Sequence, residues 1–399
     1  MNGAHLENTE LTAPPVASTI QQRSLIIGAV FAVLSLVGAF VQPDRFYAAY
    51  LLAYMLWVGL SLGCMALLML VHMTGGDWGQ AMRRILEAGS RTIFLMAPLF
   101  LPIVLGIRHL YVWARPEEIA RDKHLQEITR TYLNPAGFTA RAVVYFAIWV
   151  VLAWLLNKWS AEQDSPPPKD TGHRFRVLSG PGLVLYAFTL AFAAIDWVMS
   201  LNPGWISTIY GLLFLAGECL SAVCFVVVVV RILHRYKPVS EFMKPDYVHD
   251  YGKLMLTFIM VWAYFSFSQW LIIWAGNLPE EISWYLRRLH GGWQMIGLVL
   301  ALFHFAVPFA FLLSRPLKRN IGKLVYVAVF LMLMRYVDMF WYIEPTFHAS
   351  FHLSWLDVVV PVAIGGFWLA FFFRSLKQRP LLPVYDVHTQ PVLEPAHHG

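Results

Sequence analysis

Long apolar stretches alternate with short polar segments along the whole chain. Each apolar stretch has the roughly 17–25 residues that a helix needs to cross a bilayer. We predict spans at 24–41, 46–71, 92–112, 138–159, 178–201, 206–232, 254–275, 293–313, 321–343 and 355–373. The pattern therefore predicts an all-α polytopic membrane protein with about ten transmembrane helices.

Several short motifs occur twice, four spans apart. WARPEEI (113–119) closes the third span and WAGNLPEEI (274–282) closes the seventh. The sequence Leu-Ser-x-x-Cys begins at Leu60 and again at Leu220, and Asp196-x6-Pro203 recurs as Asp338-x6-Pro345. These pairs indicate that a four-helix unit is duplicated.

The duplication predicts how the chain is organised. Helices 2–5 and 6–9 form two four-helix bundles, and the first and last helices flank them. The expected parts are a cytoplasmic N-terminal tail (1–23), a peripheral helix (24–41), the two bundles (46–201 and 206–343), a second peripheral helix (355–373) and a cytoplasmic C-terminal tail (374–399).

Composition supports lipid as the solvent. Hydrophobic residues make up 58% of the 399 residues and charged residues 14%, which is too little charge for a soluble fold of this size. The pI near 9.2 reflects basic loops, not a nucleic-acid-binding stripe. Most Lys and Arg lie in the termini and the even-numbered loops, so the positive-inside rule predicts that both termini are cytoplasmic.

Ionisable residues within spans are costly and are candidates for function. Asp196, followed by Trp197, lies near the outer end of the fifth span, where a desolvated carboxylate can accept a proton from a quinol hydroxyl. We expect His109 or Tyr111 to lie opposite Asp196 across a quinol site, with Arg108 beside them. A hydrogen bond from Asp196 to a neighbouring helix end, and snorkelling of Arg108 and His109, remain alternatives.

The second copy offers a chain of buried polar groups at staggered depths. Such groups can conduct protons or can simply hydrogen-bond neighbouring helices. Arg335 precedes Asp338 by one helical turn, so this pair can also be a buried ion pair that orients helices. The proton-path candidates are Glu218, Tyr264, Ser266, Gln269, His304, Arg335 and Asp338.

Two longer strings carry a family resemblance. IDWVMSLNPGWISTIY (195–210) and FSFSQWLIIWAGNLPEE (265–281), within the duplicated ten-span pattern, resemble the NrfD/polysulfide-reductase membrane-subunit family. Within that family the chain is most similar to the F subunit, the second quinone-subunit homologue, of bacterial alternative complex III. The resemblance covers roughly residues 24–375.

The resemblance implies a subunit of a quinol:cytochrome c (or other acceptor) oxidoreductase complex in the bacterial inner membrane. The implied partners are a multihaem cytochrome c subunit, an iron–sulfur subunit, a larger NrfD-like paralogue and small membrane subunits, all in contact with lipid. Haem c and iron–sulfur clusters would belong to those partners. This chain would carry no cofactor of its own and would bind, at most, a quinol such as menaquinol.

Two other classes fit the sequence. A secondary transporter also uses internal repeats and charges within the membrane, but commonly with inverted repeats and broken helices at the midplane. Here the repeat spans an even number of helices, so both copies have the same orientation. A purely structural assembly subunit fits every residue named above.

Overall fold

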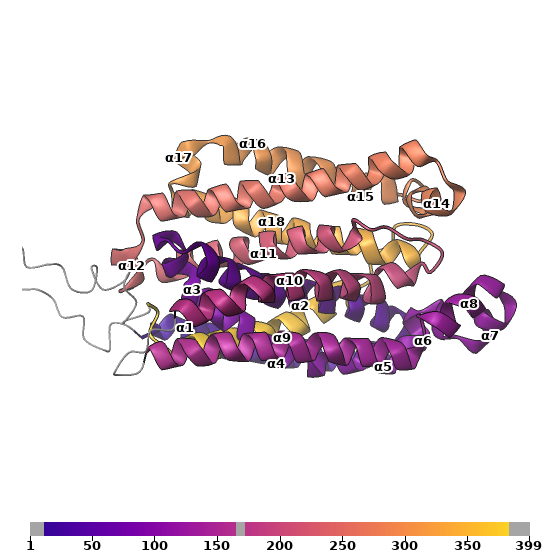
Figure 1. Ribbon diagram of the computed structural model, residues 1–399, viewed down its shortest axis with the longest axis horizontal. Helices are drawn as coiled ribbons and strands as arrows, with labels where there is room; N and C mark the ends of the chain where they lie inside the picture. The colour runs from indigo at the N-terminus through magenta and orange to yellow at the C-terminus, as the bar shows by residue number, and fades with distance from the viewer. Residues whose placement is uncertain (1–11, 165–171, 383–399) are drawn as a thin grey trace, which may run out of the picture.

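The computed structural model describes residues 12–164 and 172–382, which form helices and no β-strand. The long helices lie side by side along the longest axis (Figure 1). Among the described residues, nine helices are long and apolar enough to span a membrane, and one bent segment makes a tenth. The predicted all-α polytopic fold of about ten helices is therefore confirmed. The unbroken long helices are α1 (Pro15–Val41), α2 (Pro43–Thr74), α9 (Pro135–Gln163), α10 (Gly172–Trp197), α11 (Tyr210–Leu233), α13 (Pro245–Gly276), α18 (Ile321–Ile343) and α19 (Leu356–Leu376).

The third span is bent. It consists of α3 (Asp77–Arg91), α4 (Ile93–Met96), η1 (Pro98–Phe100) and α5 (Leu101–Leu105), and its two halves meet at 49°. Pro98 lies at the break, where a residue without a backbone N–H interrupts the helical hydrogen bonds. The eighth span is also irregular, because a π-helical segment, η4 (Leu300–Ala306), separates α15 (Trp293–Val299) from α16 (Val307–Leu313).

Two predicted boundaries were wrong. The third span begins near Trp78 and not at residue 92, because α3 is enclosed by α2, α9 and α19. Arg83, Arg84 and Glu87 of α3 are buried in protein. Hydropathy assumes that lipid surrounds a segment, so it did not identify α3 as part of the span. The first helix likewise begins at Pro15 and not at residue 24.

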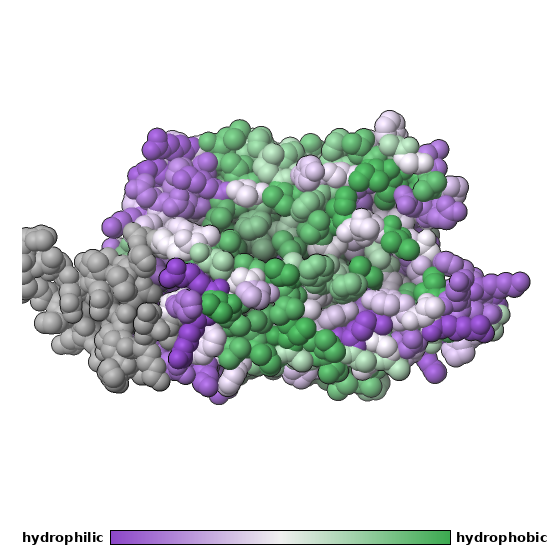
Figure 2. All heavy atoms as spheres, in the orientation of Figure 1, coloured by the Kyte–Doolittle hydropathy of each residue, from purple (hydrophilic) through white to green (hydrophobic). Residues whose placement is uncertain are grey.

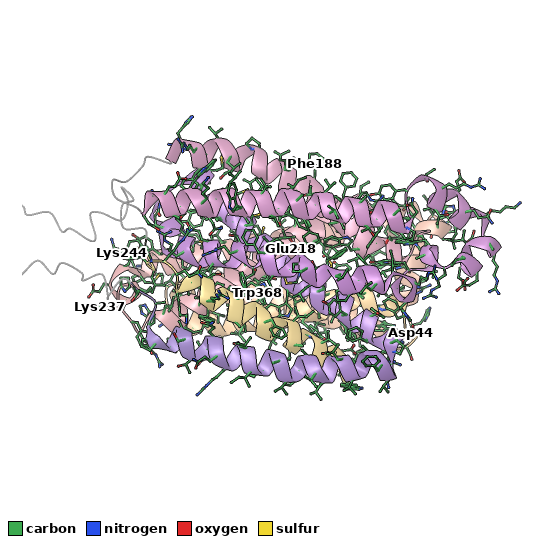
Figure 3. All side chains as sticks on the ribbon, turned by 90° about the horizontal axis from the view of Figure 1, so that it is seen from below. Asp44, Phe188, Glu218, Lys237, Lys244 and Trp368 are labelled. Carbon is green, nitrogen blue, oxygen red and sulfur yellow. The ribbon has the colours of Figure 1, made fainter. Side chains whose placement is uncertain are left out.

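The two ends of the helix bundle are polar and the middle is apolar (Figure 2). We call them the α12 face, with α12 (Val239–Phe242) and α17 (Arg315–Lys318), and the α14 face, with α14 (Pro279–Arg288). Lys237 and Lys244 lie near the first face and Asp44 near the second (Figure 3). The remaining short elements are α6 (Ile107–Leu110), η2 (Val112–Ala114), α7 (Pro116–Arg121), α8 (Lys123–Thr131), η3 (Met199–Leu201) and η5 (Glu344–Thr346).

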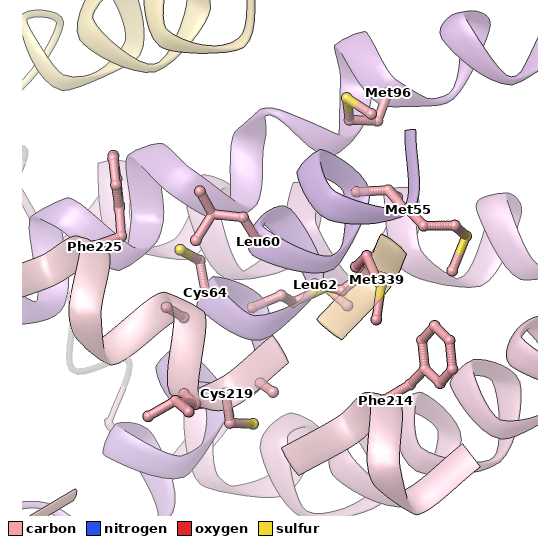
Figure 4. Packing of buried hydrophobic residues seen from close by; sticks show 14 of the residues in the cluster. Met55, Leu60, Leu62, Cys64, Met96, Phe214, Cys219, Phe225 and Met339 are labelled. Carbon is pink, nitrogen blue, oxygen red and sulfur yellow. The ribbon is translucent and has the colours of Figure 1, made fainter. Parts of the chain in front are cut away.

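Helices α2 and α11, with which the two predicted bundles begin, form the centre of the molecule. Their apolar windows are 83% and 89% buried, and they pack directly against each other (Figure 4). Glycine makes this approach close, because a Cβ built at Gly63 would lie 2.2 Å from the carbonyl oxygen of Glu218. Small residues at helix contacts are the main means by which membrane helices pack tightly.

The flanking helices α1 and α19 pack on each other and then on α2. Two tryptophans fasten α19 to α2 by hydrogen bonds. Trp368 Nε1 donates to Ser61 Oγ at 2.9 Å, and Trp57 Nε1 donates to the Pro361 carbonyl oxygen at 2.9 Å. Trp368 and Glu218 both lie near the middle of the long axis (Figure 3).

Gly63→Ala should destabilise the protein, because the new methyl group must push α2 away from α11. Overpacking of this kind costs about 1–3 kcal/mol, which should appear as a lower thermal unfolding temperature in detergent. Gly180→Ala in α10 is the matched control, since a Cβ there meets nothing closer than 3.8 Å. Equal unfolding temperatures for the two variants would contradict the close contact.

Candidate functional site

A cavity of about 750 Å³ lies in the second bundle, between α13, the α15–η4 span and α18, with α14 at one end. Apolar and aromatic side chains supply most of its wall, as is typical of sites for small organic ligands. A few polar groups interrupt that wall. The aromatic lining residues are Trp262, Tyr264, Phe267, Trp270, Trp284, Phe305, Trp341 and Tyr342, and the polar ones are Ser266, Gln269, Tyr285, Gln294 and Asp338.

Asp338 is the acid of the cavity wall, and its side chain is buried. One carboxylate oxygen, Oδ2, forms an ion pair with Arg335, one turn earlier on α18, and accepts a hydrogen bond from Trp262 Nε1 at 3.2 Å. The other oxygen, Oδ1, is buried without a hydrogen-bond partner. A buried acceptor without a hydrogen-bond partner costs free energy. Oδ1 of Asp338 can therefore accept a hydrogen bond from a ligand in the cavity.

The π-helical segment shapes the wall beside this acid. Its wider turn places His304 against Trp262, with the two rings stacked at 4.2 Å between centroids and 2° between planes. π-bulges are rare and often mark functional sites. His304 therefore lies behind the tryptophan that bonds Asp338, and it is not among the residues that line the cavity.

The α14 end of the cavity is closed by a polar cluster. Ser207 Oγ donates to Gln269 Oε1 at 3.0 Å, and Gln269 Nε2 donates to the Tyr285 hydroxyl oxygen at 3.3 Å. Burial raises the pKa of Tyr285 to about 12, so it is a neutral phenol. Gln269 and Tyr285 thus form an amide–phenol pair in the same cavity wall as Asp338.

Arg288 anchors α14 in this position. The side chain is fully buried, and no carboxylate of the described residues forms an ion pair with it. Its guanidinium donates to the carbonyl oxygens of Trp341 and Tyr342 at 3.1 and 3.0 Å and lies 3.4 Å from the centroid of the Trp284 ring. These groups are the C-terminal carbonyls of α18, which favour a cation, while burial lowers the Arg288 pKa to about 9.

The cavity opens sideways. Tyr264 lines it and is also 66% exposed on the apolar flank of the molecule, and Phe267 and Trp270 are similarly exposed. Around the opening, α13 packs against η4 and α16, whereas α15 packs against α14 and α18. In a membrane, this opening between α13 and α15 would face lipid.

Asp196, the acid of the predicted first bundle, has hydrogen-bond partners for both of its oxygens. Asp196 is fully buried, and Arg141 donates to both carboxylate oxygens, from Nε to Oδ2 at 2.8 Å and from NH2 to Oδ1 at 3.0 Å. Tyr145 donates to Oδ2 at 2.9 Å. Three donors therefore saturate this carboxylate, and Arg141 in turn lies over the Tyr132 ring at 3.8 Å.

Of the first-bundle candidates, only Tyr111 and Trp197 lie beside Asp196. The Tyr111 hydroxyl donates to the Trp197 carbonyl oxygen at 2.8 Å. Of the two alternatives expected opposite Asp196, the structure places Tyr111 there, whereas His109 Nδ1 lies 2.6 Å from Asp44 Oδ1 at the α14 face. Arg108 is exposed there too; the snorkelling alternative describes both residues better.

Glu218 lies where the two bundles meet. Tyr186 donates to its Oε2 at 3.0 Å, and Oε1 is buried without a partner. Arg335 is close enough to interact electrostatically with Glu218 as well as with Asp338. One arginine of the second bundle therefore stands between the acid of the bundle interface and the acid of the cavity.

The structure brings Ser266, Gln269, Tyr264 and Asp338 to one cavity, with Arg335 and His304 behind its wall. Sequence reasoning missed the partners. Arg141 and Trp262 hydrogen-bond the two acids, Tyr285 bonds Gln269 and Arg288 fixes α14, and each has a weak local signal in the sequence. Arg141, for example, is a cation in the first turns of an apolar span, four residues before Tyr145.

Comparison with known proteins adds no relationship. No protein-family model matches the chain, and no curated protein matches it significantly.

Asp338→Asn should destabilise the protein strongly, because Arg335 would keep its buried charge and lose the carboxylate with which it forms an ion pair. Breaking a buried pair in this way costs about 3–5 kcal/mol. The double variant Arg335→Met/Asp338→Asn should recover much of that loss, as measured by thermal unfolding in detergent. Asp250→Asn is the control, since Asp250 pairs with Lys253 at the surface, where pairs contribute about 1 kcal/mol or less. Equal loss in the Asp338 and Asp250 variants would contradict the buried pair.

Proposed function

We propose that this chain is an integral membrane subunit of a quinol:electron-acceptor oxidoreductase complex, with cytochrome c as the expected acceptor. Its own contribution is a quinol pocket in the second bundle, a proton path beside it, and a scaffold for partner subunits. The observation that carries the proposal is the cavity, which is aromatic, opens toward lipid and contains one acid with a free oxygen.

The shape and polarity of the cavity suit a quinol. A quinol has a flat ring with a hydroxyl at each end and a long apolar tail, so it needs aromatic walls, two polar partners and an exit to lipid. Asp338 supplies one polar partner, and Gln269 with Tyr285 supplies the other. The tail would leave between α13 and α15, past Tyr264 and Phe267.

The same groups define the chemistry that this chain would perform. Asp338 Oδ1 would accept a hydrogen bond and then a proton from one quinol hydroxyl, while Arg335 and Trp262 hold the carboxylate in place. Gln269 would orient the second hydroxyl, whose proton would pass to water at the α14 face. Quinol oxidation also releases two electrons, and these would pass to haem c or iron–sulfur centres in the partner subunits that the resemblance implies.

The partners proposed are those implied by the resemblance: a multihaem cytochrome c subunit, an iron–sulfur subunit, a larger NrfD-like paralogue and small membrane subunits. The resemblance implies a bacterial inner membrane, and the distribution of Lys and Arg supports an orientation with the α12 face in the cytoplasm. The quinol pocket would then lie toward the outer side. Asp196 is a weaker candidate for the proton acceptor, because three donors already occupy its oxygens.

Filling the cavity should impair quinol-dependent turnover of the complex. Ala263→Phe places a ring in the cavity wall beside Trp262, and we expect KM for quinol to rise about tenfold, the equivalent of about 1.4 kcal/mol of lost binding. The measurement is quinol:cytochrome c reductase activity of the purified complex, after its visible spectrum and subunit masses establish that haem c partners are present.

The matched control is Val329→Phe, which adds the same ring to α18 at a position exposed to lipid and should leave KM unchanged. Asp196→Asn tests the first bundle in the same assay. Loss of turnover in Asp196→Asn with normal kinetics in Ala263→Phe would move the quinol site to the first bundle. A colourless chain that purifies alone would overturn the oxidoreductase proposal altogether.

The proton path makes a separate prediction. Glu218→Gln keeps the hydrogen bond from Tyr186 but removes the titratable group, so proton translocation in sealed vesicles should fall while electron transfer continues. The ratio of protons moved to electrons transferred is the quantity to measure. A ratio equal to that of the unmodified protein would make Glu218 a structural residue.

A further inference from the structure

A second cluster of buried charge lies at the α12 face, away from the quinol cavity. It is built on α3, the charged half of the third span, and on the ends of α9 and α19. Arg83 and Arg84 bind Glu87 at 2.9 and 2.8 Å, and Arg84 also pairs with Asp164. Arg379 reaches the same Glu87 at 3.5 Å.

The cluster carries more positive than negative charge. Its cations are Arg83, Arg84, Arg91 and Arg379, and the carboxylates that they contact among the described residues are Glu87 and Asp164. Leaving Arg83 aside, Arg84, Arg91 and Arg379 face two carboxylates among the described residues. Uncompensated charge in a membrane protein is costly, so the cluster favours an anion beside Arg91.

Arg91 forms no ion pair with a carboxylate of the described residues, although Glu87 is near enough to interact with it electrostatically. Arg91 makes no hydrogen bond or ion pair with the described residues and is partly exposed. Together with Arg84, Asn157 and Arg379 it lines a cavity of about 10 Å³, which holds about one water molecule. An anion that binds here must therefore sit at the mouth of this cavity, against Arg91 and Arg379.

Unpartnered polar atoms at the same place independently indicate a missing ligand. Arg84 is 3% exposed and its Nε has no hydrogen-bond acceptor, and Asn157 Oδ1 has no donor. Buried donors and acceptors nearly always have partners. A water molecule in the small cavity, bridging to an anion outside it, would satisfy both atoms.

The setting favours a lipid over a soluble anion. Asp164 caps the end of α9, and Arg379 lies three residues beyond the end of α19, so the cluster sits at the level of lipid headgroups. One turn before Asn157 on α9, Trp154 is 50% exposed, and Val151 is 51% exposed, which offers apolar surface to an acyl chain. Basic pockets between membrane helices at the cytoplasmic side commonly bind anionic headgroups.

We propose that Arg91 and Arg379, supported by Arg84, bind the phosphate of an anionic phospholipid at the α12 face. The lipid completes the charge balance of α3 and holds the polar half of the third span inside the bundle. Its phosphodiester accepts charge-assisted hydrogen bonds from the two guanidinium groups, and its acyl chains lie along α9.

Native mass spectrometry of the full chain, with any subunits that purify with it, tests this site. After exchange into detergent with phosphatidylglycerol, the unmodified protein should retain one more phosphatidylglycerol per chain than Arg91→Gln. Arg91→Lys keeps the charge and should keep that lipid. Arg374→Gln removes an exposed arginine from the last turn of α19 and should also keep it.

A titration of the unmodified, delipidated protein makes the test independent of how well the variants fold. Phosphatidylglycerol should raise the thermal unfolding temperature, whereas phosphatidylcholine and inorganic phosphate should not. Equal lipid retention by Arg91→Gln, or equal stabilisation by phosphatidylcholine, would overturn the proposal. Stabilisation by inorganic phosphate alone would also overturn it, because the site would then bind a soluble anion.

Discussion

The close approach of α2 and α11 is the contact on which the rest of the structure depends. Lipid tails are as apolar as the helices, so burial of apolar surface cannot hold the two bundles together, and tight packing must do so. Gly59 and Gly63 provide it by letting α11 come within contact of the α2 backbone beside Glu218. Because each of these helices begins a bundle, their contact fixes how the bundles meet. It also explains why Glu218 is buried at the interface, where its side chain accepts a hydrogen bond from Tyr186.

The repeated Asp-x6-Pro motif has a different setting in each half of the chain. In the first, Arg141 comes from the neighbouring helix α9 and grips both oxygens of Asp196, and Tyr145 completes the set. In the second, Arg335 comes from the same helix as Asp338 and leaves one oxygen free in the wall of a cavity. Arg141 joins two helices through Asp196 and so leaves no space between them. Arg335 lies on the same helix as Asp338, so their ion pair does not draw a second helix toward the acid. The difference in the origin of the arginine therefore separates a structural acid from one that can serve a ligand.

The sequence predicted the spans and the polar residues within them, but not which of those residues meet. Asp338, Gln269 and Ser266 were predicted as a polar set because buried polar groups are costly wherever they occur in a span, and they do share one cavity. The start of the third span, the charged helix α3, was missed because charged residues lower the hydropathy of a segment. Hydropathy assumes that lipid surrounds a segment, and it fails where protein surrounds it, as for Arg83 and its partners. The sequence could not decide between His109 and Tyr111, because the partner of His109, Asp44, lies 65 residues away in sequence.

Arg335 links the cavity to the proposed proton path. It stands between Glu218 at the bundle interface and Asp338 in the cavity, so two carboxylates share one cation. A quinol hydroxyl that gives its proton to Asp338 would neutralise one of these carboxylates and leave the arginine to the other. The charge state of Glu218 would then respond to the occupant of the cavity through a single side chain, without any movement of a helix. A purely structural ion pair has no need of the second carboxylate, and burying it at the interface would only add to the cost of the fold.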